Sequence, residues 1–193
     1  VSSHFLLSMV MVFITVALYV RILEPEGKPR VTVNPLLHAI SVGLVVIGFL
    51  LLIAGTVVTG TGPHGGDALA PRWDLNLELI TPVHSGLAWL TLVAAAVAAV
   101  LAFRTGAARP VRVASVALVG LVIMQGVLGY TQYALALPES LVVLHVLGSA
   151  LTWIAIARLY FSTTRLEAPG EAVTVLPEEH DGARTPAGPA SGQ

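Results

Sequence analysis

The segment 36–59, LLHAISVGLVVIGFLLLIAGTVVT, decides the fold class of this 193-residue chain. It contains no Asp, Glu, Lys or Arg, and an apolar stretch of about 20 residues is long enough to cross a bilayer as a helix. Four further apolar segments of this kind lie at 1–20, 79–103, 111–133 and 140–162. Spanning β-strands would be shorter and would alternate apolar with polar residues, which these segments do not. The sequence therefore predicts an all-α integral membrane protein with five transmembrane helices.

The composition excludes most other classes of protein. Hydrophobic residues make up 55% of the chain and charged residues 11%, whereas soluble domains carry about 25% charged residues. Lys plus Arg (10) nearly balances Asp plus Glu (11), so no attraction to nucleic acid is predicted. The absence of cysteine excludes disulfides, thiolate metal sites and cysteine nucleophiles. We therefore expect membrane lipid to be the partner that surrounds most of the chain.

The distribution of positive charge predicts the orientation. Nine of the ten Lys and Arg residues lie in segments that would share one side of the membrane, and only Arg72 lies on the other. Because cytoplasmic loops carry the excess of Lys and Arg, we predict a multi-pass protein of the cell membrane with its N-terminal edge outside. The tail 164–193 is rich in Pro, Gly, Ala and Glu, and we expect it to be disordered in the cytoplasm.

Two histidines fall at matching depths in the predicted helices. His84 and His145 each lie about five residues inside helices that begin on the outer side, which places both imidazoles about 7–8 Å below the outer helix ends. Such a pair can face each other across a planar ligand, and neutral imidazole is an axial ligand of haem iron. No cysteine or intramembrane carboxylate accompanies the pair, which argues against a zinc or di-iron site. A hydrogen-bonded interhelical pair is the alternative.

The surroundings of the histidines leave several roles open. Small residues follow both histidines on the same helix face: Ala88, Thr91 and Ala95, and Gly148, Ser149 and Thr152. They leave room for a macrocycle or allow tight helix contact. Arg72 is the candidate partner of a haem propionate, and the alternative is an interfacial loop with Trp73 at the membrane boundary. The role of His64 stays open, and Gln125 and Gln132 could link helices or contact a cofactor.

The first apolar segment repeats features of the last. An alignment of HFLLSMVMVFITVALYVR with HVLGSALTWIAIARLYFS pairs His4 with His145, Ser8 with Ser149 and Tyr19 with Tyr160. This predicts that 1–20 is the last helix of an incomplete N-terminal bundle, that 21–35 is a cytoplasmic loop, and that 36–163 is a four-helix bundle. His4 would then be half of a second metal-ligating pair. We therefore expect the chain to be a fragment of a longer protein.

Four motifs resemble the C-terminal half of haem A synthase, an eight-helix membrane protein: GTVVTGTGPHGGD at 55–67, TPVHSGLAWL at 81–90, QGVLGYTQY at 125–133 and VVLHVLGSAL at 142–151. The resemblance covers about residues 1–163. It implies an oxidoreductase that oxidises the C8 methyl of haem O to the formyl of haem A for cytochrome c oxidase biogenesis, with water as the oxygen source. It implies haem b (iron) held by His84 and His145, with the substrate haem O in the other bundle, where His4 is the matching histidine.

The resemblance also implies what this chain lacks. The catalytic carboxylate belongs to the other half of the enzyme, so we do not assign Asp67, Asp74 or Glu78 to that role and expect the fragment alone to be inactive. Some family members carry a cysteine pair in the outer loop, which this chain does not. The implied partners are haem O synthase or cytochrome oxidase assembly proteins, with a homo-oligomer as a further expectation. The alternatives are a bis-histidine cytochrome b subunit that only transfers electrons, and a structural protein or transporter half.

Overall fold

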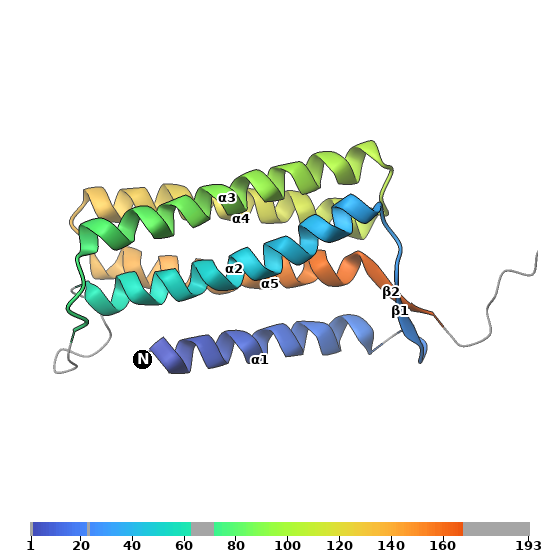
Figure 1. The fold of residues 1–193 in the computed structure, drawn as a ribbon, viewed down its shortest axis with the longest axis horizontal. Coiled ribbons are helices and arrows are strands. Elements are labelled where there is room, and N and C mark those ends of the chain that lie inside the picture. Colours follow the sequence, from blue (N-terminus) through green and yellow to red (C-terminus); the bar gives the residue numbers. More distant parts are fainter. Residues whose placement is uncertain (1, 23, 63–71, 168–193) are drawn as a thin grey trace, which may run out of the picture.

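A computed structural model describes residues 2–22, 24–62 and 72–167 of the chain. Figure 1 shows the helices that this part of the chain contains: α1 (Ser2–Arg21), α2 (Pro35–Thr61), α3 (Leu77–Arg104), α4 (Arg109–Ala134) and α5 (Glu139–Ser162). All five are long and apolar enough to cross a membrane. The prediction of five hydrophobic helices is therefore confirmed, and the described residues are those of a multi-pass membrane protein by length and composition.

The helix starts follow from local chemistry. The Asn34 side chain accepts a hydrogen bond from the Leu36 amide (2.9 Å), and Asn76 accepts one from the Glu78 amide (2.8 Å). Such caps satisfy amides that have no partner within the helix. Pro35 follows Asn34 in the first turn, where the missing proline N–H costs nothing. Pro82, in contrast, lies inside α3 beyond its first turn, so it removes one backbone hydrogen bond near the N-terminal end of that helix.

The helices lie side by side along one direction. α2 packs against α3 and α5, α4 packs against the same two helices, and α1 packs mainly against α5 (Figure 1). The α2–α3 and α4–α5 connections share one end, which we call the loop end; the α1–α2 and α3–α4 connections share the opposite end, which we call the ribbon end (Figure 1). Among the described residues, every Lys and Arg except Arg72 lies at the ribbon end. The two ends therefore differ in charge as the sequence requires for the predicted orientation.

The interior is packed most tightly toward the ribbon end. The helices α2, α3, α4 and α5 all contribute fully buried side chains there: Leu37 and Leu44 of α2, Ala98 and Ala102 of α3, Val111 and Leu118 of α4, and Leu159 of α5. Toward the loop end, the buried positions stop at Thr91 in α3, Val122 in α4 and Gly148 in α5. Small side chains let helix backbones approach closely, so the three helices make their closest contacts in the half away from the loops.

A short strand pair named β1 and β2 closes the ribbon end. β1 (Lys28–Val31) and β2 (Thr164–Glu167) pair in antiparallel register, with Lys28 opposite Glu167 and Val31 opposite Thr164. The prediction that the tail is disordered from residue 164 is therefore wrong for 164–167. These four residues carry too little pattern of their own to predict a strand, and their backbone is paired only because the α1–α2 connection lies beside them. Residues 168–193 lie outside the described part of the chain.

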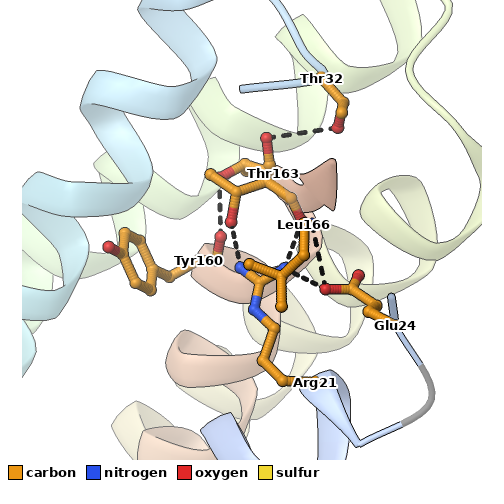
Figure 2. A network of polar contacts seen from close by, with 7 residues as sticks. Arg21, Glu24, Thr32, Tyr160, Thr163 and Leu166 are labelled. Atoms are coloured by element: carbon orange, nitrogen blue, oxygen red, sulfur yellow. Dashed lines mark hydrogen bonds and ion pairs between the residues drawn. The ribbon is translucent and has the colours of Figure 1, made fainter. Parts of the chain in front are cut away.

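Arg21 links the end of α1 to this strand pair. The Arg21 guanidinium donates hydrogen bonds to the Glu24 carboxylate, as Figure 2 shows, and to Thr164, whose backbone oxygen (3.1 Å) and hydroxyl both accept. The same Glu24 oxygen accepts from the Leu166 amide (3.2 Å). Arg21 is the last residue of α1, where a positive charge is also stabilised by the partial negative charge of the helix end. The network attaches α1 to the chain that leaves α5.

Within the hydrophobic layer, α1 is held by one face only. The indole Nε1 of Trp153 in α5 donates a buried hydrogen bond to the Met9 backbone oxygen (2.8 Å), and Phe13 packs on the same indole with ring centroids 5.5 Å apart. The opposite face of α1 is exposed and carries Leu7, Met11, Ile14 and Leu18. α1 therefore has a second apolar face that no described residue covers.

Candidate functional site

The structure brings together the two histidines that the sequence analysis selected. The imidazoles of His84 in α3 and His145 in α5 lie with their ring centroids 6.4 Å apart and their planes at 65°. Two imidazoles that share one metal ion have centroids roughly 6 Å apart, because each metal–nitrogen bond is about 2 Å long and each nitrogen lies about 1 Å from its ring centre. The observed separation is compatible with two ligands of one metal ion, and it also lies within the range of about 4.5–7 Å in which two rings make an ordinary edge-to-face contact.

Each imidazole lies against a glycine of the preceding helix. His84 Cε1 lies 3.2 Å from the position that a Cβ atom would occupy on Gly55 of α2, and His145 Cε1 lies 3.3 Å from that position on Gly129 of α4. Any side chain at either glycine would press on the ring. Both glycines lie in the motifs quoted from the sequence, but no role was predicted for either. The signal was their place inside a helix, where a glycine costs about 1 kcal/mol relative to alanine.

Unsatisfied polar atoms gather around this histidine pair. In the described part of the chain, the buried side-chain nitrogen and oxygen atoms without a hydrogen-bond partner are His84 Nδ1, His145 Nδ1, Gln125 Nε2 and Gln132 Oε1. Buried hydroxyls elsewhere in the interior donate to carbonyls of their own helix, as Thr91 does to Leu87 (2.8 Å) and Thr152 to Gly148 (2.9 Å). An unpaired polar group in a membrane interior is costly. The concentration of such groups here points to a site that binds something polar or metallic.

The two glutamines lie along α4 on either side of Gly129. Gln125 lies on Gly148 of α5, with its Nε2 1.7 Å from the position of a Cβ atom on that glycine. Gln132 lies two turns further along α4, near the loop end. Neither Gln125 Nε2 nor Gln132 Oε1 pairs with a neighbouring helix. The sequence left two roles open for the glutamines, linking helices or contacting a cofactor. An interhelical link is not formed through these two atoms.

The small residues that follow the histidines serve helix contact. Thr91 and Ala95 are fully buried, and Gly148 and Thr152 are buried as well. Of the two explanations for these small side chains, tight packing of the helices applies on the ribbon side of the pair.

Arg72 is exposed at the loop end. Its neighbour Trp73 donates its backbone amide to the Gly60 oxygen (3.2 Å), and the indole packs on Gly60, with Cδ2 3.3 Å from the position of a Cβ atom there. Gly60 lies five residues beyond Gly55 on α2, which is about 7–8 Å along the helix axis. Arg72 is thus placed at the end nearest the histidine pair, and its contact with a haem propionate stays a prediction.

The other described histidines, His4 and His38, are not brought to the pair. His4 is exposed on α1. His38 lies at the ribbon end, where its Nδ1 is 2.8 Å from the Thr163 hydroxyl and its ring stacks on Tyr160. His64 and His180, as well as Asp67, lie outside the described residues.

Comparison with known proteins adds no relative. No protein family, curated protein or solved structure matches the chain.

The chemistry of the site fits a haem with two histidine ligands. Within the described residues, no group of three or more His, Asp or Glu side chains is placed to hold a metal ion, so the donor set at this site is the imidazole pair. A metal with two protein ligands needs its other ligands from elsewhere, and a porphyrin supplies four nitrogens in one plane.

An apolar groove of about 370 Å³ lined by Val10, Val46, Phe49 and Trp153 lies between α1 and α2 and involves neither histidine.

Proposed function

We propose that this chain is part of a haem A synthase and that α2–α5 form a four-helix bundle that holds haem b between His84 and His145. The observation that carries the proposal is the pair of imidazoles 6.4 Å apart, each with an unpaired buried Nδ1. The motifs around Gly55, His84, Gly129 and His145 supply the link to this enzyme family.

The proposed reaction converts the C8 methyl of haem O into the formyl group of haem A. With water as the source of oxygen, the methyl carbon gains one oxygen atom and releases four electrons and four protons. A haem with both axial positions filled supplies one-electron transfer and has no open position for a substrate. His84 and His145 would therefore hold a haem that could relay these electrons one at a time to an external electron acceptor, while the oxidation itself would take place in another bundle.

We propose that this other bundle packs against α1 and that His4 ligates the haem O within it. His4 shares its helix face with Leu7, Met11 and Leu18, each more than half exposed (63%, 57% and 64%). An ionisable side chain on a membrane helix is expected to face protein rather than lipid. A neighbouring bundle would cover this face and complete the second histidine pair, with the catalytic carboxylate in its outer loop.

The ends of the helices support the proposed orientation in the cell membrane. The ribbon end carries the Lys and Arg residues of the described chain other than Arg72, so we place it in the cytoplasm and the histidine pair in the outer half of the membrane. Haem O is largely apolar apart from its propionates and would reach the enzyme within the membrane. Haem O synthase and cytochrome oxidase assembly proteins are therefore the proposed partners, one delivering the substrate and the others receiving the product.

Ligation is tested by optical spectroscopy of the purified protein. We expect His84→Ala and His145→Ala each to remove the low-spin, six-coordinate haem b spectrum, whereas His38→Ala should leave it unchanged, because His38 lies at the opposite end and contacts Thr163. A double variant of His84 and His145 that kept the wild-type Soret and α bands would refute the assignment of both ligands.

Catalysis is tested by pigment analysis of membranes from cells that make haem O but lack their own haem A synthase. The natural full-length gene product should produce haem A, and His4→Ala and His84→Ala should each abolish its formation. The 193-residue chain alone should bind haem b without producing haem A. Haem A formed by that chain alone would show that the catalytic bundle has been assigned wrongly.

A bis-histidine cytochrome b subunit is the second candidate. It is favoured by the completeness of the His84–His145 pair within one set of packed helices, which is sufficient for electron transfer. The same pigment analysis separates the two, since a cytochrome b subunit would show the haem b spectrum, lose it in the histidine variants and never yield haem A.

A further inference from the structure

A second groove lies at the ribbon end, where α3 meets α4. It has a volume of about 410 Å³, and its lining divides into a basic end and an apolar wall. Arg109 and Arg112 form the basic end. The apolar wall is formed by the side chains of Phe103, Val113, Val116 and Ala117. Such a groove offers complementary contacts to a ligand that joins an anionic head to an apolar tail.

The periodicity of α4 explains why most of these side chains lie together. Residues 109, 112, 113, 116 and 117 have the spacing of one helix face. α4 begins at Arg109, so both arginines belong to its first turn, and the apolar residues of the face follow one and two turns further into the membrane span. A phospholipid in the surrounding bilayer has the same order, with its charged headgroup at the surface and its acyl chains toward the middle.

The two arginines of the groove have no acidic partner among the described residues. The ion pairs in that part of the chain join Arg21 to Glu24 and Arg30 to Glu167, and both lie beside the strand pair. The first turn of α4 contains no Asp or Glu, and Ala108, which precedes it, provides no side-chain cap. The positive charge of the groove is therefore left for a ligand.

The position of these arginines is unfavourable for the helix alone. The amides at a helix N-terminus carry a partial positive charge, so acidic side chains are favoured there and basic ones are disfavoured. Arg104 supplies positive charge at the same end without this repulsion, because it lies in the last turn of α3. An anion between the start of α4 and the guanidinium groups of Arg109 and Arg112 would be attracted by all three. A local rule broken in this way is expected at a binding site.

An aromatic ring orders one of the two guanidinium groups. The Arg112 Cζ atom lies 5.6 Å from the centre of the Phe103 ring in α3, which is the distance of a cation–π contact. Phe103 is itself exposed and lines the groove. The contact restricts a planar fork of N–H donors whose geometry matches the paired oxygens of a phosphate. Less side-chain freedom is then lost when an anion binds.

We propose that this groove binds one anionic phospholipid. Its phosphate lies between Arg109 and Arg112 at the start of α4, and one acyl chain lies along Val113, Val116 and Ala117. The ribbon end is the proposed cytoplasmic end, and basic residues beside a membrane helix attract the anionic lipids of the cytoplasmic leaflet. Haem binding is not required for this interaction.

The test is native mass spectrometry of the purified protein with phosphatidylglycerol and, separately, with phosphatidylcholine of the same acyl chains. Phosphatidylglycerol should bind more tightly. Arg109→Gln and Arg112→Gln should each weaken its binding roughly tenfold, which is the effect of one charge-assisted hydrogen bond. Arg158→Gln is the matched control, because Arg158 is an exposed arginine of the ribbon end that does not line the groove. It should leave the affinity unchanged.

The apolar wall is tested separately from the charge. Val116→Trp fills the groove without changing the charge and should weaken the binding of phosphatidylglycerol. Val93→Trp is its control, since Val93 is an exposed valine of α3 outside the groove. Inorganic phosphate at the concentration of the lipid should not displace it, because the ion makes no contact with the apolar wall.

Four outcomes would overturn the proposal. Equal affinity for the two phospholipids, or equal loss in Arg158→Gln and Arg112→Gln, would show that no specific anion site exists. Displacement of the lipid by inorganic phosphate would show that the groove takes phosphate alone. A dimer that dissociates in Arg112→Gln, with no lipid bound, would show that a second copy of the chain covers the groove. Unfolding of Val116→Trp leaves the decision to the arginine variants.

Discussion

Replacing Gly129 by valine should displace His145 from the position in which it faces His84. An alanine Cβ at this position would lie 3.3 Å from His145 Cε1, a few tenths of an ångström inside the optimal carbon–carbon contact of about 3.5–4.0 Å. The ring can yield by that amount, so Gly129→Ala should weaken haem binding only slightly. Valine adds two methyl carbons about 1.5 Å further out, which the ring cannot accommodate without leaving the axis that it shares with His84.

The expected size of the effect follows from overpacking. Extra methyl groups in a packed interior cost about 1–3 kcal/mol. If the ring must adopt its ligating position for haem to bind, that cost appears in the affinity, which should fall roughly 5- to 150-fold, since about 1.4 kcal/mol corresponds to a factor of ten. The low-spin spectrum should convert in part to the high-spin spectrum of a haem with one histidine ligand.

The assay is haem titration of the purified protein followed by optical spectra at saturation. Gly126 provides the matched control, because it lies three residues earlier on α4 and a Cβ atom there would have nothing within 4 Å. Gly126→Ala and Gly126→Val should bind haem as the wild type does. Equal affinity and an unchanged low-spin spectrum in Gly129→Val would refute the argument that the two glycines hold the imidazoles in place for ligation.

Three further predictions concern topology and stability. A cysteine at Asp74 should react with a membrane-impermeant reagent in intact cells and one at Ala108 should not; the reverse pattern would overturn the orientation. Trp153→Phe, which removes a buried hydrogen bond, should lower resistance to SDS unfolding by about 0.5–1.5 kcal/mol. Trp89→Phe, which removes an exposed hydrogen bond to the Tyr130 hydroxyl (3.1 Å), should lower it less. Arg21→Gln should remove about 1.5 kcal/mol of hydrogen-bond stabilisation from the strand pair and therefore speed amide exchange in β2 roughly tenfold. Unchanged exchange would show that the Arg21 network does not hold the strand pair.

The sequence by itself determined the five helices and the similar depth of the two histidines, although α3 and α5 begin at Leu77 and Glu139, so that His84 and His145 lie seven and six residues beyond these starts rather than five. Each apolar segment is long enough to span a bilayer on its own, and its ends carry local signals such as Asn34 before Pro35. The depth of His84 and of His145 follows from counting residues at a fixed rise per residue. These properties depend on one segment at a time, so no knowledge of its neighbours is needed.

Only the tertiary structure decided which faces of the helices meet. A helix of a soluble protein reveals its buried face by its polar residues, but a membrane helix is apolar on all sides, so its rotation is not written in its hydropathy. The contacts of His84 with Gly55 and of His145 with Gly129 therefore could not be predicted, and neither could the unpaired amide of Gln132. The β1–β2 pair was missed for a related reason: backbone hydrogen bonds between segments more than 130 residues apart in the chain form only because α1 and α5 pack together, which no local pattern records.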